Sequence, residues 1–164
     1  MPEFGEPKFE QKEEVTVEII EEVTDNLLEA VRKYTPELAS VNQVPITKEW
    51  LESIVESDST LLLAAKENRE KIVGLAVLVV YRTLVNPRAL LETLVVDPNS
   101  RRQGAAKELI KQALEEARKR KVNTLRLATG KNNEASNPLF VQMGGELSED
   151  YNWYDFVLSE GPQT

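Results

Sequence analysis

The sequence predicts one α/β domain, in which about four helices flank a mixed, mostly antiparallel, twisted sheet. Three strand-like segments follow one another directly over residues 61–96, which indicates antiparallel pairing. A strand, a long amphipathic helix and another strand then follow over residues 90–129, which indicates one parallel pair. With 164 residues, the chain is long enough to bury a substantial core in a single domain.

The N-terminal part predicts one strand and two helices. Apolar and polar residues alternate over residues 15–19, which is typical of a strand. Thr24 is a preferred N-cap residue before an amphipathic helix that extends to about Tyr34. Thr47 stands in the same way before a second amphipathic helix, and residues 36–46 form a loop between the two.

The middle of the chain predicts a β-hairpin and a third strand. Apolar runs over residues 61–66 and 71–82 are joined by four polar residues, the pattern of a hairpin with a short loop. The third strand covers residues 90–96, and Asp97 and Pro98 stop it.

The C-terminal part begins with the longest helix and returns to strands. A small apolar face recurs at helical spacing after Gly104, and Gly144 and Gly145 end a later, shorter helix. The expected elements are a helix over residues 104–120, a buried strand over 124–129, a short helix over 133–143 and a last hairpin of residues 146–148 and 153–158.

The composition removes several kinds of chemistry. The chain has no cysteine, so it has no disulfide, thiol nucleophile or thiolate metal site. It has no histidine, which excludes a Ser-His triad and most catalytic zinc sites. We therefore expect no metal, and acid-base chemistry falls to Glu, Asp, Tyr, Lys or water. The longest apolar run, residues 72–81, is too short to span a bilayer, and no signal peptide is evident, so we expect a cytoplasmic protein without a membrane partner.

The net charge of −8 is distributed unevenly along the chain. Residues 97–131 hold ten Lys and Arg against four Asp and Glu, whereas residues 132–164 hold six acidic residues and no basic one. A chain this acidic is a poor binder of nucleic acid, so we expect no nucleic-acid partner. A basic stretch within an acidic protein instead indicates a small polyanionic ligand at that stretch.

The junction between the third strand and the long helix has the composition of an anion site. The first amides of a helix have no intrahelical partner, and they lie at the positive end of the helix dipole. Gly104, Ala105 and Ala106 are small enough to let a phosphate approach the backbone, and Arg101 and Arg102 add positive charge. A Walker A loop and a dinucleotide fingerprint both fit poorly, because their Lys and their further glycines are missing.

Three motifs resemble those of the GCN5-related N-acetyltransferase (GNAT) superfamily. The matching segments are Arg101-x-x-Gly104-x-Ala106, the preceding strand over residues 91–98, and Asn133-x-x-Ser136-x-x-Leu139-Phe140-x-x-x-Gly144. Their order and spacing agree with that family over about residues 14–158. The resemblance implies a GNAT-like sheet in which the central parallel strands are splayed apart.

The resemblance also implies acetyl-CoA as the acyl donor. Its pyrophosphate is expected on the helix-start amides and its pantetheine arm along the fourth strand, in the manner of an added strand. The implied cofactor-binding residues are Leu94, Val95, Val96, Arg101, Arg102, Gln103, Gly104, Ala105, Ala106, Asn133 and Phe140. Asn133 is equally suited to cap the short helix.

Glu92 is the candidate catalytic residue. Acyl transfer needs a neutral amine, and Glu92 is a carboxylate within an apolar strand that could remove the amine proton. A solvent-facing or ion-paired Glu92 is the alternative. Phe140 occupies a position where many family members have a Tyr that protonates the leaving thiolate, and Phe cannot donate a proton.

The sequence therefore predicts an N-acetyltransferase that moves an acetyl group to a primary amine by direct attack. Residues 24–58 carry seven acidic and three basic residues, which favours a cationic small-molecule or peptide amine. A non-catalytic acyl-CoA-binding module and an acidic protein-interaction domain are the alternatives, and a homodimer is left open. We expect an acidic disordered tail over residues 1–13, the domain over 14–158 and a short tail over 159–164.

Overall fold

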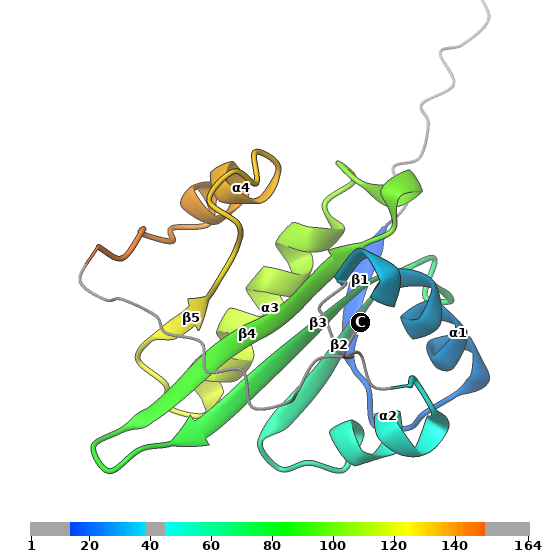
Figure 1. Ribbon diagram of the computed structural model, residues 1–164, viewed down its shortest axis with the longest axis horizontal. Helices are drawn as coiled ribbons and strands as arrows, with labels where there is room; N and C mark the ends of the chain where they lie inside the picture. The colour runs from blue at the N-terminus through cyan, green and yellow to red at the C-terminus, as the bar shows by residue number, and fades with distance from the viewer. Residues whose placement is uncertain (1–13, 39–44, 150–164) are drawn as a thin grey trace, which may run out of the picture.

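The computed structural model describes residues 14–38 and 45–149, which form an α/β fold around one five-stranded sheet (Figure 1). The strands lie in the order of the chain, from β1 at one edge to β5. They are β1 (Val15–Ile19), β2 (Thr60–Glu67), β3 (Lys71–Arg82), β4 (Pro87–Val96) and β5 (Leu125–Leu127). The first four strands pair antiparallel, and β4 pairs with β5 in parallel. The predicted mixed, mostly antiparallel sheet is confirmed.

Four α-helices accompany the sheet, as predicted. They are α1 (Asp25–Tyr34), α2 (Lys48–Val55), α3 (Ala105–Lys119) and α4 (Ser136–Gln142), with short 3₁₀ helices η1 (Thr35–Leu38) and η2 (Pro98–Ser100). The predicted caps form at the first two helices. The hydroxyl of Thr24 accepts the Leu27 N–H at 3.2 Å, and that of Thr47 accepts the Trp50 N–H at 3.2 Å.

The sheet is covered on both faces, which creates two apolar clusters. Helix α3 packs across one face, where Leu109 and Ala113 are fully buried against Leu63, Val73 and Leu78 of the strands. Helices α1 and α2 cover the other face over β1 to β3 (Figure 1). Leu139, Phe140 and Met143 at α4 pack at the margin of the α3 cluster. Burial of these side chains is the main stabilising contribution to the fold.

Three predictions for the C-terminal part need correction. Strand β5 is shorter than residues 124–129 and is half-buried rather than buried, because its pairing with β4 covers only three residues. Helix α4 begins at Ser136 rather than near residue 133, because the Asn133 side chain accepts the Ser136 N–H and forms a turn first. Residues 146–148 form no strand. The expected partner strand over 153–158 and both expected tails lie outside the described residues.

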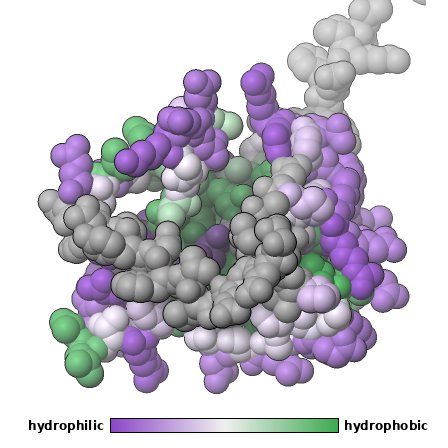
Figure 2. Space-filling model, in the orientation of Figure 1, coloured by the Kyte–Doolittle hydropathy of each residue, from purple (hydrophilic) through white to green (hydrophobic). Residues whose placement is uncertain are grey.

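The β3–β4 hairpin extends to an apolar tip. Leu84 and Val85 at that tip are almost fully exposed, and Figure 2 shows a hydrophobic protrusion there. Within residues 14–38 and 45–149, no helix has the length and apolar character that a membrane span requires.

Candidate active site

The start of α3 carries amides that no side chain caps. Its N-cap residue is Gly104, which has no side chain to accept from the helix, whereas α1 and α2 both have a threonine cap. The first intrahelical bond there runs from the Glu108 N–H to the Gly104 carbonyl at 3.0 Å. The amides of residues 105–107 therefore point out of the longest helix without an intrahelical acceptor.

The turn before α3 needs backbone conformations that favour glycine. Gly104 has φ of 98°, and a Cβ placed on it would meet no atom within 4 Å. Arg102 also has a positive φ, of 62°. Such turns direct successive N–H groups into one concavity that suits an anion. Because the space over Gly104 is open, a phosphate could approach this backbone closely.

Asp97 holds the same turn against the core. It is 2% exposed, and its Oδ1 accepts the Asn99 N–H at 3.0 Å, which fixes η2. Its Oδ2 accepts from Lys33 Nζ at 2.5 Å and lies 3.2 Å from the Tyr34 hydroxyl, so both contacts come from α1. These hydrogen bonds, that from Lys33 first, lower the pKa of Asp97 to about 2.

A second buried carboxylate supports this arrangement from the β2–β3 hairpin. Glu67 is 3% exposed and pairs with Lys71 Nζ at 2.8 Å. The hydrogen bonds from Lys71 and from Ser100 of η2 hold the pKa of Glu67 below its usual range, against the opposing effect of burial. Two carboxylates from different elements therefore anchor the short turn between β4 and α3.

Strand β4 leaves its partner β5 after Leu91. The parallel register runs from the Ala89–Leu125 pair to the Leu91–Leu127 pair, whereas β4 stays paired with β3 as far as Val96. The chain after β5 diverges from β4 on its way to α4 (Figure 1). The β5-facing edge of residues 92–96 is thus without a strand partner in the described part of the chain, which confirms the predicted splaying.

Glu92 lies where this divergence begins. The β3–β4 register shifts there, since Leu91 pairs with Leu78 and Thr93 with Val77, which leaves Glu92 as the extra residue of a β-bulge. Its side chain is exposed. Glu92 therefore faces solvent, which was the alternative considered from the sequence. Its exposure also leaves the carboxylate accessible to a substrate.

The predicted cofactor residues gather around the open end of β4. Leu94 and Val96 are half-buried and face α3, whereas Val95 is buried against the α1–α2 side. Arg101 Nε donates to the Val96 carbonyl at 3.3 Å, so this side chain lies across the end of the strand. Arg102, Gln103 and Gly104 are exposed, Ala105 is buried and Ala106 is half-buried. Figure 2 shows hydrophobic residues gathered at the centre of this face.

Phe140 and Asn133, the two predicted site residues of the second motif, differ in burial. Phe140 is half-buried in the margin of the α3 cluster, so it packs on the side of Leu94 and Val96. Asn133 is exposed, and its Oδ1 accepts the Ser136 N–H at 3.1 Å within the turn that precedes α4. At the other end of α4, a Cβ on Gly145 would lie 3.0 Å from the Phe140 carbonyl oxygen, a tight contact that a side chain at this position would have to displace.

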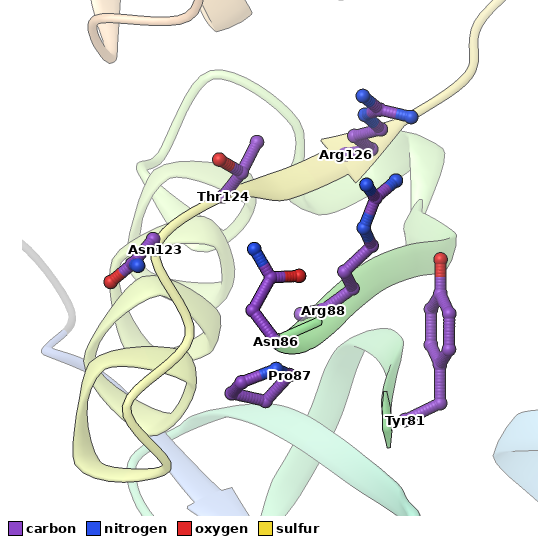
Figure 3. A pocket seen from close by; sticks show the side chains of 8 residues that line it. Tyr81, Asn86, Pro87, Arg88, Asn123, Thr124 and Arg126 are labelled. Carbon is purple, nitrogen blue, oxygen red and sulfur yellow. The ribbon is translucent and has the colours of Figure 1, made fainter. Parts of the chain in front are cut away.

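Two features, one at each end of β4, escaped the sequence analysis. From the sequence, Asp97 was interpreted only as the end of a strand and Glu67 only as a loop residue. A polar hollow at the start of β4 and β5 contains Arg88 and Arg126 (Figure 3). The available signal for the hollow was one arginine in each of two mostly apolar strands.

The comparison with protein families shows which family this chain belongs to. A sequence model described as the acetyltransferase (GNAT) family matches residues 24–144, which include β4, the turn and α4 up to Gly144. The chain belongs to the acetyltransferase (GNAT) family. The resemblance seen in its three motifs is therefore confirmed. No curated protein matches the sequence significantly.

Solved structures of GNAT proteins share the fold. A probable acetyltransferase superposes with a TM-score of 0.76 at 19% identity, covering 90% of this chain and 99% of its own. AAC(6')-Iy, solved with a bisubstrate analogue of CoA and acetylneamine, gives 0.72 at 20% identity over 88% and 99%. A ribosomal-protein-alanine N-acetyltransferase from Brucella melitensis biovar Abortus 2308 gives 0.69 at 18% identity over 88% and 99%. At these identities the likeness establishes the fold.

The GNAT fold of this chain has features that suit acyl-CoA. An uncapped helix start suits a pyrophosphate, and the unpaired edge of β4 suits an amide-containing arm. Among residues 14–38 and 45–149, no group of three or more acidic side chains is placed to hold a metal ion.

Proposed function

We propose that this protein is an N-acetyltransferase that transfers the acetyl group of acetyl-CoA to a primary amine by direct attack. The observation that carries the proposal is the meeting of the uncapped start of α3 with the open edge of β4. Family membership supports acyl transfer in general. Acetyl-CoA supplies the activated thioester. The residues of this chain bind and orient acetyl-CoA and the amine, and they accept the amine proton.

The binding roles follow from the local geometry. The amides of residues 105–107 and the charge of Arg102 would hold the pyrophosphate. The free backbone groups of β4 between Glu92 and Val96 would pair with the amides of the pantetheine arm. This places the thioester beside the bulge, where β4 and β5 separate.

Glu92 would serve as the base, directly or through one water. An alkylamine is mostly protonated at neutral pH, so its proton must leave before the nitrogen can attack the carbonyl carbon. Attack forms the amide C–N bond and breaks the C–S bond, so CoA leaves as a thiolate. The bulge makes the Glu92 carboxylate accessible at the splay point.

The acceptor would approach as a cation. Helices α1 and α2 carry four of the seven acidic residues of the 24–58 segment, and the two helices cover the sheet face opposite α3. A negative potential over that face raises the local concentration of ammonium groups. The solved AAC(6')-Iy complex, with its acetylneamine-containing analogue, is consistent with an amine acceptor in this fold.

A second candidate, an acyl-CoA-binding module without turnover, is favoured by one observation. Phe140 offers no proton to a leaving thiolate, and it packs into the α3 cluster. If proton supply limits the reaction, Phe140→Tyr should raise kcat; if water protonates the thiolate, the variant should match the parent.

Acetyl-CoA and a panel of primary amines, with thiol release and product mass measured together, test the proposal. Equal amounts of free thiol and acetylated amine are expected with at least one amine. Binding of CoA by calorimetry without any turnover would assign the protein to the binding modules. If the protein neither binds CoA nor acetylates any amine, the proposal is refuted. A protein-interaction domain would then be the remaining hypothesis.

A further inference from the structure

We propose that the hollow at the start of β4 and β5 binds an oxyanion carried by the acceptor. The substrate would then be an amine whose other end is a carboxylate or a phosphate. This inference rests on the proposed function: the ammonium group of the acceptor is kept, and an anionic group is added at the other end of the molecule.

The hollow has a volume of about 200 Å³ and lies near the β3–β4 turn (Figure 3). Its lining includes Arg88 of β4 and Arg126 of β5, together with Tyr81 and the amide side chain of Asn86. In Figure 3 the Arg88 side chain extends from β4 toward Arg126. The hollow is thus at the opposite end of β4 from the helix-start anion site.

The strand alternation places both arginines on the sheet face opposite α3. Ala89 and Leu91 pack in the α3 cluster, so the alternating residues Arg88 and Leu90 point to the other face. Leu125 and Leu127 pack there as well, which puts Arg126 on the same face as Arg88. The register makes Leu90 the Cα partner of Arg126, so the arginines are diagonal neighbours.

Arg88 brings a positive charge to this hollow. Arg88 is half-buried and forms no ion pair within residues 14–38 and 45–149. The described lining residues include no Asp or Glu. The planar Arg88 guanidinium would donate bidentate hydrogen bonds to a bound oxyanion, whose negative charge would offset that of the guanidinium. The Asn86 amide and the Tyr81 hydroxyl are further donors.

The hollow and the proposed base lie along one strand. Arg88 precedes Glu92 by four residues, which is about 13 Å of extended chain. Leu90 points to the same face between them, and it would contact the apolar part of an acceptor. An amine at Glu92 and an oxyanion at Arg88 would therefore be the two ends of one molecule lying along β4.

Acceptors of one chain length, differing only in the distal group, test this inference. The panel is aminocaproate, aminohexyl phosphate, aminocaproamide and hexamethylenediamine, with kcat and KM measured for each. We expect an oxyanion to raise kcat/KM at least about tenfold over the amide, mainly through KM, since charge-assisted hydrogen bonds form only with it. Comparison of kcat/KM for aminocaproate and aminohexyl phosphate shows whether the hollow prefers a carboxylate or a phosphate.

Three variants separate the hollow from general surface charge. Arg88→Ala should abolish the preference for the oxyanion, and Arg88→Lys should keep part of it because the charge remains but the planar fork is lost. Arg82→Ala is the matched control, since Arg82 is an exposed arginine at the end of β3 outside the lining. It should leave the preference unchanged. Preference for the amide or the diamine, or a preference that persists in Arg88→Ala, would overturn the inference.

Calorimetry with aminocaproate and aminohexyl phosphate distinguishes failure of the inference from failure of the proposed function. If no amine is acetylated but one of these compounds binds and Arg88→Ala loses that binding, the hollow is an oxyanion site and the proposed function is wrong. If amines are acetylated without regard to the distal group, the function stands and the hollow is not part of the acceptor site. If neither compound binds and no preference appears, the inference is refuted.

Discussion

Glu92 is the single residue on which the proposed chemistry depends most. It owes its position to a β-bulge, because the extra residue in β4 turns its side chain away from the regular pleat at the point where β5 departs. An exposed carboxylate in an apolar strand has no packing role that would account for it, so its proposed role lies in the reaction.

Glu92→Gln tests that role directly. Gln preserves the size and hydrogen bonding of the side chain but cannot accept the amine proton. We expect kcat to fall on the order of 10²–10⁴ at neutral pH, with CoA affinity nearly unchanged. The loss should shrink at high pH, where more of the amine is already neutral. The pH profile of kcat for both proteins is the measurement, and equal rates across it would assign the base to water or another residue.

Individual residues also show which features of the site could be predicted from the sequence and which could not. The threonine caps and the glycine of the helix-start turn, Gly104, could be predicted, because local backbone chemistry alone favours them. The bulge at Glu92 could not, because it is a property of the register between two strands. The partners of Asp97 could not either, since Lys33 is 64 residues away in the chain.

At the scale of elements, Asp97 and Glu67 tie α1, the β2–β3 hairpin and η2 into one unit. The strands and helices themselves follow from apolar periodicity, which the sequence displays. The length of β5 does not follow from it, because an apolar run shows where a strand can form but not where its neighbour turns away.

The Asp97 network predicts how stability depends on pH. The folded pKa of Asp97, about 2, is below the ordinary value of 3.8 for an aspartate. The ion pair therefore stabilises the fold fully above pH ~5, and this contribution of about 2 kcal/mol is lost as the pH falls through ~2. Urea unfolding of Asp97→Asn and the parent should differ by about that amount at pH 7, and the difference should narrow toward pH 2.

The exposed carboxylate Glu21 provides the control for this prediction. Glu21→Gln should unfold like the parent at every pH, because that side chain is exposed and has no ion pair in the described ranges. A difference between Asp97→Asn and the parent that stays constant from pH 7 to pH 2 would show that the lost packing, and not the titrating carboxylate, destabilises the variant.

At the scale of the whole molecule, the basic residues concentrate in one stretch of the chain. The basic stretch over residues 97–131 lies at the α3 side of an otherwise acidic protein with a net charge of −8. Polyanionic CoA would be drawn to it in spite of the overall negative charge, because clustered charges act over about a Debye length of 8–10 Å.

CoA binding should consequently weaken with salt. We expect Kd to rise several-fold between low and high ionic strength, and we expect Arg102→Gln to reduce that dependence, since Arg102 is exposed beside the helix start. Lys48→Gln, which removes an exposed charge on α2, should leave the dependence unchanged. Calorimetric titration at several salt concentrations measures it, and a salt-independent Kd would place CoA away from the basic stretch.

The central claim, that the start of α3 binds the phosphates of acyl-CoA, has a direct test in Gly104. Gly104→Glu introduces a negative charge and a Cβ at φ of 98°, where side chains are strained. Gly104→Asn is the matched control, because Asn tolerates that conformation and adds no charge. Thermal unfolding of both variants without ligand measures the strain separately. Calorimetry should then show CoA affinity at least about tenfold weaker in Gly104→Glu than in Gly104→Asn; equal affinity in all three proteins would contradict the account.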